Sequence, residues 1–206
     1  KKTSFREKLW QFRNRTADEI CRRMGNRRGG ILCAVLLGDS FYTEEEVKEL
    51  YRVAGIGHLL AISGLHISFL GTGLYRGLRK SGFSILQAGV AGSLLLGSYV
   101  VMTGMSVSAL RAFTMFLIRM GAELTGREYD GLTALGIAES GLLLTNPLRL
   151  FTAGFQLSFA AVLGIYLIDP GKKKGRFSDS VRMSVELWFF LLPATLWHYY
   201  ETCLYA

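Results

Sequence analysis

Apolar residues are concentrated in long blocks that short charged stretches separate. The clearest block is 83–103, which contains no Lys, Arg, Asp or Glu. About 20 apolar residues in a helix, at roughly 1.5 Å per residue, cross the ~30 Å hydrocarbon layer of a bilayer. The pattern therefore predicts five or six membrane-spanning helices. Their approximate ranges are 57–75, 83–103, 107–124, 132–144, 148–168 and 185–206.

The N-terminal region, 1–24, has a different pattern. Apolar residues recur at helical spacing from Phe5 onward, and arginines, Arg13 among them, cover much of the remaining surface. This predicts a basic amphipathic helix, which the segment 26–30 breaks before a short apolar run at 31–37. Such a helix can lie in the membrane interface with its apolar face inward, or it can pack on its own protein with a solvated charged face.

The fold class follows from these blocks. We predict an all-α protein: a polytopic transmembrane helical bundle with an N-terminal basic amphipathic helix. The composition agrees, since 50% of the residues are hydrophobic and 24 of the 206 are glycine. Small residues four positions apart, as at Ala88 and Gly92 or Ala160 and Gly164, let helices approach closely in lipid. Because the chain begins with Lys1 and ends within an apolar run, we expect an internal piece of a longer membrane protein.

Positive charge is concentrated near the N-terminus. The net charge is +8, and residues 1–28 hold ten Lys or Arg against three acidic residues. Further basic residues at 76–80, 119–127 and 172–176 fall between alternate predicted spans, which assigns those loops to the cytoplasm and residues 1–56 to the outer side. A basic outer segment suits anionic lipid or nucleic acid. Its candidate phosphate-binding residues are Arg22, Arg23, Arg27 and Arg28.

A few polar residues interrupt the spans. Polar and ionisable groups are costly within hydrocarbon, so they usually face a protein-lined or water-lined interior. At ~1.5 Å per residue along a helix, four of these side chains fall in the outer half of their predicted spans. They are His66, Arg111, Glu139 and Gln156. Two interpretations stay open: contacts between helices, such as an Arg111–Glu139 ion pair, or the lining of a path for a charged cargo. The candidate lining residues are Ser63, His66, Arg111, Glu139, Phe155 and Gln156, with His58 at the outer rim.

Catalytic and metal-binding interpretations have less support. His58 and His66 would be ~12 Å apart along one helix, too far for one metal ion to bind both. Ser63 and His66 are three residues apart and could form a dyad, but no acid that would orient the histidine is identifiable. The acidic run after Thr43 indicates a capped helix start rather than a metal site. We therefore expect no metal, no cofactor and no catalytic residue in this chain.

The cysteines do not change this picture. Cys21, Cys33 and Cys203 are far apart in sequence and form no CxxC motif. They indicate neither a disulfide framework nor a zinc site.

Four blocks, in order along the chain, resemble the ComEC-type DNA-internalisation competence proteins. The run HLLAISGLHI at 58–67 is similar to the signature of that family, and LLGD at 36–39 resembles the stretch ahead of it. Two further blocks, within 104–115 and 146–164, resemble the later ones. The resemblance covers nearly the whole chain from about residue 30. Three positions depart from the family pattern, namely Val107, Glu139 and Thr152.

The resemblance implies a multi-pass channel in the bacterial cytoplasmic membrane that takes up single-stranded DNA during natural transformation. It divides the chain into a basic extracytoplasmic segment, 1–30, and a competence-type membrane domain, 31–206. The partners it implies are single-stranded DNA, membrane lipids, an extracytoplasmic DNA receptor and a cytoplasmic helicase-type motor. Any nuclease activity would lie in a domain absent from this chain. The alternatives are a secondary transporter for a small anion, an intramembrane hydrolase using Ser63 and His66, and a scaffold that only docks partners.

Overall fold

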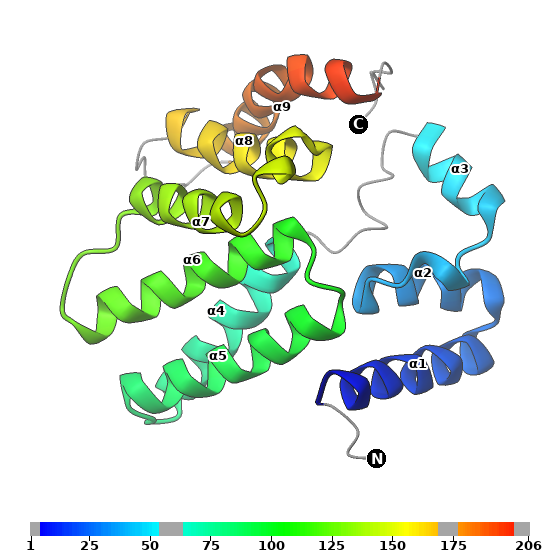
Figure 1. Ribbon diagram of the computed structural model, residues 1–206, viewed down its shortest axis with the longest axis horizontal. Coiled ribbons are helices and arrows are strands. Elements are labelled where there is room, and N and C mark those ends of the chain that lie inside the picture. The colour runs from blue at the N-terminus through cyan, green and yellow to red at the C-terminus, as the bar shows by residue number, and fades with distance from the viewer. Residues whose placement is uncertain (1–4, 54–63, 169–176, 200–206) are drawn as a thin grey trace. The chain divides into compact units, whose positions relative to one another are not determined.

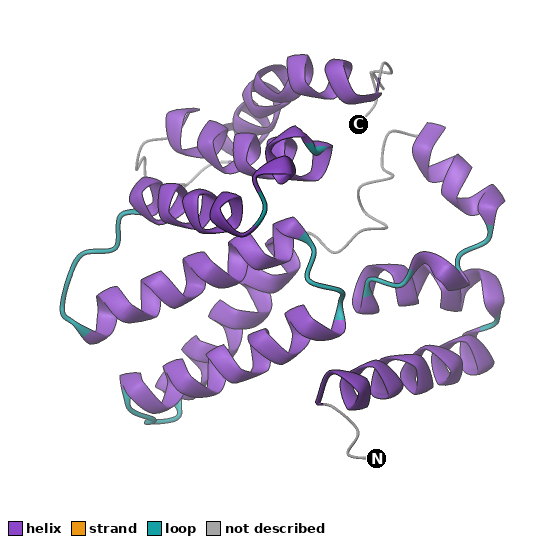
Figure 2. Ribbon diagram, in the orientation of Figure 1, coloured by secondary structure: helices purple, strands orange, loops and turns teal. Residues whose placement is uncertain are grey.

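The computed structural model describes residues 5–53, 64–168 and 177–199. Within these ranges the regular elements are helices and no residue is in a strand (Figure 2), so the predicted all-α class is confirmed. The chain divides into two compact units that meet in sequence at Met120 and Gly121. The elements of Figure 1 are α1 (Phe5–Met24), α2 (Asn26–Leu37), η1 (Ser40–Tyr42), α3 (Glu45–Val53), α4 (Gly64–Lys80), α5 (Ile85–Met102), α6 (Val107–Leu124), α7 (Gly131–Thr145), η3 (Pro147–Phe151), α8 (Ala153–Ile168) and α9 (Phe177–Tyr199).

The pair of α1 and α2 in the first unit corrects the prediction of a break over 26–30. Only Gly25 leaves the helix, with φ of 79°, and residues 26–30 form the first turns of α2. A Cβ on Gly29 would lie 2.7 Å from the Cα of Cys21, and a Cβ on Gly30 would overlap the carbonyl oxygen of Tyr42. These two glycines therefore allow α1 and η1 to pack closely on α2, and they do not interrupt it.

The start of α3 also differs from the prediction. Thr43 is buried, and its hydroxyl donates to the carbonyl oxygen of Gly30 at 3.0 Å. The helix begins at Glu45, and the carbonyl of Glu44 accepts from the N–H of Val47 and of Lys48. The predicted capping box at Thr43 is therefore wrong, because the threonine side chain connects η1 to α2 instead.

An apolar core lies among α4, α5 and α6. Glycines on α5 receive large side chains of α6: a Cβ on Gly92 would lie 3.0 Å from Cζ of Phe116, and one on Gly97 would lie 3.3 Å from Cζ of Phe113. The predicted small-residue surface at Ala88 and Gly92 is thus buried between helices. The buried residues of this core are Ile67, Tyr75, Ala88, Leu96, Val100, Ala109, Ala112, Phe116 and Met120.

The second unit contains α7, η3, α8 and α9. Asp130 caps α7, where its carboxylate accepts from the N–H of Thr133 at 2.8 Å. Gly131 lies against the phenol of Tyr166, so the start of α7 meets the end of α8. Gly164 faces α9, where a Cβ would lie 2.7 Å from Cδ1 of Phe190. Glycine contacts of this kind hold the helices of the second unit close together.

The predicted span 148–168 is interrupted. Asn146 accepts from the N–H of Leu148, and Pro147 begins the short 3₁₀ segment η3. Thr152 then adopts an extended conformation, and α8 starts only at Ala153. The prediction of one continuous 21-residue span was wrong because the Asn-Pro turn continues five residues further than its sequence signal indicates.

The last predicted span, 185–206, also has different bounds. α9 begins at Phe177 and includes an ion pair between Arg182 and Glu186, one turn apart at 2.8 Å. The end of the predicted span, 200–206, lies outside the described residues. The charged first turns show that helical structure precedes the apolar block here.

Among the described residues, α5 alone is long and apolar enough to cross a membrane. Only 28% of its 18-residue apolar window is buried, so most of its surface is not used for internal packing. Leu86, Val90 and Leu94 recur every four residues along one exposed stripe. α7 and α8 are apolar but shorter, at 15 and 16 residues. Length and composition thus mark one spanning candidate, and the predicted polytopic arrangement stays a prediction.

Candidate functional site

Two of the predicted lining residues lie at the same end of the first unit. His66 is in the first turn of α4 and Arg111 is in the second turn of α6. Short turns join α5 to both helices, so the starts of α4 and α6 meet the end of α5. Ile67, Val100 and Ala109 belong to one buried cluster at that end. The structure therefore places His66 and Arg111 at the same end of the first unit, and their role as lining residues stays a prediction.

Arg111 is the most deeply buried charged residue among the described residues. Its exposed fraction is 7%, and its neighbours Ala109 and Ala112 are core residues. A guanidinium is always charged at physiological pH, so placing one inside an apolar unit carries a large desolvation cost. Residues of this kind within membrane helices mark pathways for ions or substrates.

The other predicted lining residues belong to the second unit. Glu139 is half-buried at the middle of α7. Phe155 is buried, with its ring centroid 4.5 Å from that of Phe159. Gln156 is engaged on both sides of its amide: Nε2 donates to the carbonyl of Leu150 at 2.8 Å, and Oε1 lies 2.8 Å from Nε2 of His198. Gln156 therefore connects η3, α8 and α9 through polar contacts.

Two predicted residues, His58 and Ser63, lie outside the described residues. The proposed Ser63–His66 dyad and the outer-rim placement of His58 consequently stay predictions. The described part of the chain contains no group of three or more His, Cys, Asp or Glu side chains that could hold a metal ion.

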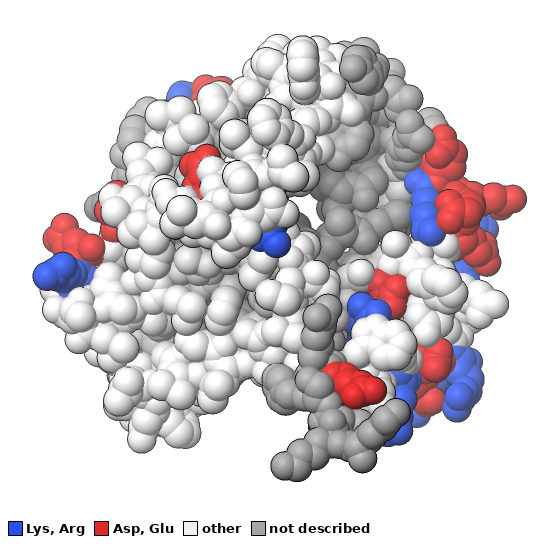
Figure 3. Space-filling view, in the orientation of Figure 1, with Lys and Arg blue, Asp and Glu red and all other residues white. Residues whose placement is uncertain are grey.

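The four predicted phosphate-binding arginines are exposed where α1 ends and α2 begins. Arg23 donates to Glu19 at 2.6 Å, and Arg22 contacts the other oxygen of the same carboxylate at 3.4 Å. The hydrogen bond from Arg23 and the two positive charges lower the pKa of Glu19. Arg27 and Arg28 are exposed on α2. In Figure 3 charged side chains gather over α1, α2 and α3, whereas the visible surface over α5 is almost uncharged.

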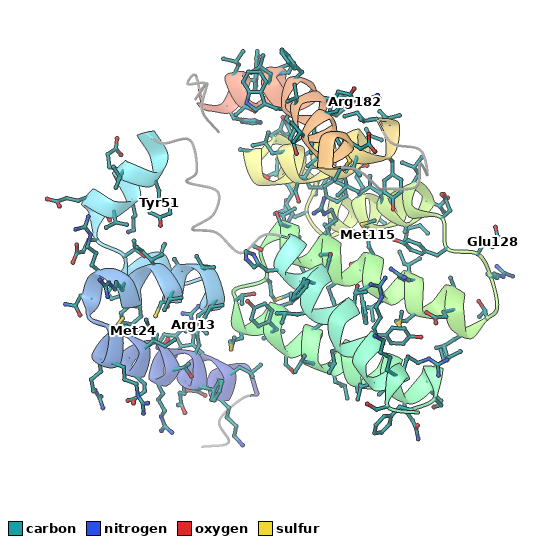
Figure 4. All side chains as sticks on the ribbon, turned by 180° about the vertical axis from the view of Figure 1, so that it is seen from behind. Arg13, Met24, Tyr51, Met115, Glu128 and Arg182 are labelled. Carbon is teal, nitrogen blue, oxygen red and sulfur yellow. The ribbon has the colours of Figure 1, made fainter. Side chains whose placement is uncertain are left out.

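An ion pair that the sequence pattern missed fastens α1 to the end of α2. Arg13 contacts Asp39 at 3.2 Å, and both side chains are largely buried, at 16% and 14% exposure. Nη1 of Arg13 also donates to the carbonyl of Met102, at the end of α5, at 3.5 Å. Arg13 (labelled in Figure 4) thus faces its own unit, which corrects its predicted place on the solvated face of α1.

Asp39 also organises the chain after α2. Gly38, with φ of 67°, ends α2 in a left-handed conformation, and Oδ1 of Asp39 then accepts from the N–H of Phe41 to start η1. In the sequence, the LLGD motif at 36–39 was the signal that marked Asp39 as a residue of interest. The pairing of Asp39 with Arg13 was not predictable, because Arg13 lies 26 residues earlier in the chain.

The end of η1 is connected to α1 by a second polar contact. The hydroxyl of Tyr42 donates to Oδ1 of Asp18 at 2.9 Å. This hydrogen bond, with some contribution from burial and from the negative charge, raises the pKa of Tyr42 to about 12. The helices α1 and α2 and the segment η1 therefore form a packed structure held by polar contacts.

Comparison with known proteins agrees with the resemblance seen in the sequence. Residues 35–206 match the family model described as "Competence protein", so the chain belongs to the competence protein family. It is 37% identical over 174 residues to ComE operon protein 3 of Bacillus subtilis, which covers 84% of this chain and 22% of that protein. Membership of this family implies a role in competence for DNA uptake.

Two more distant relatives point the same way. Recombination protein 2 of Haemophilus influenzae is 26% identical over 168 residues, covering 76% of this chain and 20% of that protein. Competence protein ComA of Neisseria gonorrhoeae is 26% identical over 166 residues, covering 74% of this chain and 23% of that protein. The chain thus spans about a fifth of the length of these relatives. No solved structure gives a significant match.

Proposed function

We propose that this chain is a membrane-embedded part of a channel that takes up single-stranded DNA in competent bacteria. The observation that carries the proposal is the buried guanidinium of Arg111, which lies in an apolar helical unit whose neighbouring helix α5 exposes a continuous apolar stripe. A fixed positive charge at such a level suits a polyanion that must cross hydrocarbon. The competence family and its named relatives supply the identity of that polyanion.

The placement of α1 and α2 supports an orientation with residues 1–56 outside. Arg13 contacts the carbonyl of Met102, and the hydroxyl of Tyr99 donates to the carbonyl of Leu36 at 2.7 Å. Both contacts are at the C-terminal end of α5. The distribution of basic loops independently assigns that end to the outer side. The basic segment and the end of α5 would then share one side of the membrane.

This orientation suggests how the charges would act on DNA. The exposed arginines at the α1–α2 junction would attract the phosphate backbone from solution, an effect that weakens as the salt concentration rises. Arg111 and His66 would contact phosphates deeper in the unit, where water is scarce. We assign transport and no hydrolytic step to this chain. The proposed partners are single-stranded DNA, lipids, an extracytoplasmic DNA receptor and a cytoplasmic helicase-type motor.

Replacing Arg111 tests the proposal. In the full-length protein of a naturally transformable host, Arg111→Met keeps a long side chain but removes the charge. We expect transformation and uptake of labelled DNA to fall at least tenfold, as for loss of a buried charge contact worth ~1.4 kcal/mol or more. Arg111→Lys should retain part of the activity because it retains the charge. His66→Ala provides a second variant in case Arg111→Met does not accumulate in the membrane.

Arg119→Met is the matched control, since Arg119 is an exposed arginine on the same helix. It should leave uptake within about twofold of the parent. Normal uptake by Arg111→Met and His66→Ala proteins, at normal membrane levels, would contradict the proposal. If purified protein in vesicles instead carried small anions in an Arg111-dependent manner, the transporter alternative would be favoured.

A further inference from the structure

Two cysteines that are distant in sequence lie side by side in the α1–α2 pair. Sγ of Cys21 on α1 is 3.9 Å from Sγ of Cys33 on α2. Cys33 is fully buried, and Cys21 is partly exposed. The pair lies inside the small cluster that also contains Ala17 and Leu37.

The packing of the two helices makes this approach possible. Gly29 is one helical turn before Cys33, and a Cβ there would lie 3.2 Å from Sγ of Cys21. The Cys21 side chain therefore occupies the space between Gly29 and Cys33. A disulfide has a sulfur–sulfur distance of about 2.05 Å, so the two sulfurs need to move together by roughly 2 Å. Rotation of the partly exposed Cys21 side chain about χ1 is a movement of that size.

We propose that Cys21 and Cys33 are a redox modification site, at which oxidation by a low-molecular-weight disulfide covalently joins α1 to α2. The contact is specific, because the two thiols face each other across a helix crossing and are protected from competing thiols by burial on the Cys33 side. The sequence had indicated no disulfide, since 12 residues separate these cysteines and no spacing motif marks them.

The reaction balances with oxidised glutathione as the oxidant. The Cys21 thiolate attacks one sulfur of oxidised glutathione, which forms a mixed disulfide and releases one glutathione thiolate. Cys33 then loses its proton and attacks the sulfur of Cys21, and the second glutathione leaves as a thiolate. In total, two protein thiols are oxidised to one disulfide and one glutathione disulfide is reduced to two glutathione thiols. Burial, together with Cys21, raises the pKa of Cys33 to about 12, so Cys21 reacts first and Cys33 closes the bond.

The biological setting of this chemistry rests on the proposed function, which places α1 and α2 outside the cytoplasm. Disulfides persist in oxidising extracytoplasmic compartments and are rare in the cytosol. A bond between α1 and α2 would hold Arg13 against Asp39 and the end of α5 when α1 is pulled by a bound partner. The modification would thus hold α1 and α2 on the end of α5.

The test uses the purified chain with Cys203→Ser, so that only Cys21 and Cys33 remain of its three cysteines. The protein is incubated in detergent with oxidised glutathione and then treated with a polyethylene-glycol maleimide under denaturing conditions. We expect complete protection from the maleimide, loss of two hydrogen atoms in the intact mass, and a monomer on a non-reducing gel. Reduction should restore two modified thiols.

In the control protein, the thiol of Cys33 is moved to another position on α2, so that the number of cysteines stays the same. Cys33→Ser combined with Leu36→Cys puts the thiol on the same helix at an exposed position, 49% exposed in the parent. This protein should yield glutathione adducts at both cysteines and no intramolecular bond. The proposal is overturned if the Cys21/Cys33 protein also stops at glutathione adducts, or if it forms only intermolecular dimers.

A measurement in cells separates this inference from the proposed orientation. Thiols are trapped with acid and a maleimide in the intact host before extraction. An oxidised pair in cells supports both the modification site and the outward placement. A pair that oxidises when purified but is reduced in cells supports the modification site and contradicts the outward placement.

Discussion

Tyr42 is a single residue through which pH can act on the packing of α1. Its hydroxyl donates to Asp18, and the pKa of the phenol is raised to about 12. An unfolded tyrosine titrates near pH ~10. Because the folded pKa is the higher one, the hydrogen bond stabilises the fold below about pH 10, and this stabilisation is lost as the pH rises toward about 12.

Tyr42→Phe should therefore lower the free energy of unfolding by about 1 kcal/mol at pH 8 and by almost nothing near pH ~12. Unfolding in detergent at a series of pH values measures the difference. In a parallel absorbance titration, Asp18→Asn should move one tyrosinate transition to lower pH, because the negative partner is gone. A constant difference between parent and Tyr42→Phe across this range would contradict the assignment.

Arg13 shows which contacts of a residue cannot be predicted from the sequence. Helical spacing placed it among the solvated arginines of α1, yet it is paired with Asp39 and contacts Met102. A helical wheel shows only the neighbours of a residue within its own helix. Both partners of Arg13, Asp39 and Met102, come from later parts of the chain. The hydrogen bond between Gln156 and His198 was missed for the same reason, since 42 residues separate them.

Among the elements, the crossing of α8 and α9 depends on one glycine. A Cβ on Gly164 would lie 2.7 Å from Cδ1 of Phe190 and 2.8 Å from Cδ1 of Leu187, distances at which these side chains or their helix must shift. In lipid, helix association relies on such close packing, because the apolar surroundings provide no hydrophobic drive. Small residues at this crossing are therefore part of what holds the second unit together.

Gly164→Ala should lower the stability of the second unit by ~1–3 kcal/mol, as expected for overpacking. Gly136 on α7 is the matched control, because a Cβ added there would meet no atom within 4 Å. Gly136→Ala should be neutral or stabilising by up to roughly 1 kcal/mol, since alanine restricts the unfolded chain. Unfolding in detergent compares the two. Equal effects of both substitutions would mean that the crossing tolerates a methyl group.

Prediction from sequence was most accurate where one physical signal dominated the element. The range 107–124 coincides with α6, and α5 lies within one or two residues of its prediction, because apolar blocks there end at short polar turns. Accuracy was lower where glycine or proline had two possible roles. Gly29 and Gly30 signalled a break but serve close packing, and the effect of Pro147 extends to Thr152 through η3.

At the scale of the whole molecule, the alternation of basic loops predicts which turns of the chain face the cytoplasm and which face outward. The turn after α4 should face the cytoplasm and the turn after α5 should face outward. Ser81 and Ser106 are exposed residues in these two turns. With the three native cysteines replaced by serine, Ser106→Cys should react with a membrane-impermeant maleimide in intact cells, and Ser81→Cys should react only after the cells are opened.

Thr125→Cys, at the exposed end of α6, extends this test to a third position and should behave like Ser81→Cys. Labelling of Ser81→Cys and Thr125→Cys from outside, with Ser106→Cys protected, would reverse the orientation. Equal labelling of all three from outside would contradict the placement of α5 and α6 across the membrane.

If the second unit lies in the membrane, as the proposed function requires, the interruption at Thr152 has a consequence for the surrounding lipid. α7 has 15 residues and α8 has 16, so each is only about 22–24 Å long. A bilayer with ~30 Å of hydrocarbon would have to become locally thinner beside these two helices, or its headgroups would have to bend toward them. Such a dimple shortens the apolar barrier by several ångströms and brings water closer to the bilayer centre. If single-stranded DNA crosses at this protein, as proposed, the thinnest part of the membrane is the least costly place for its negative charges to cross.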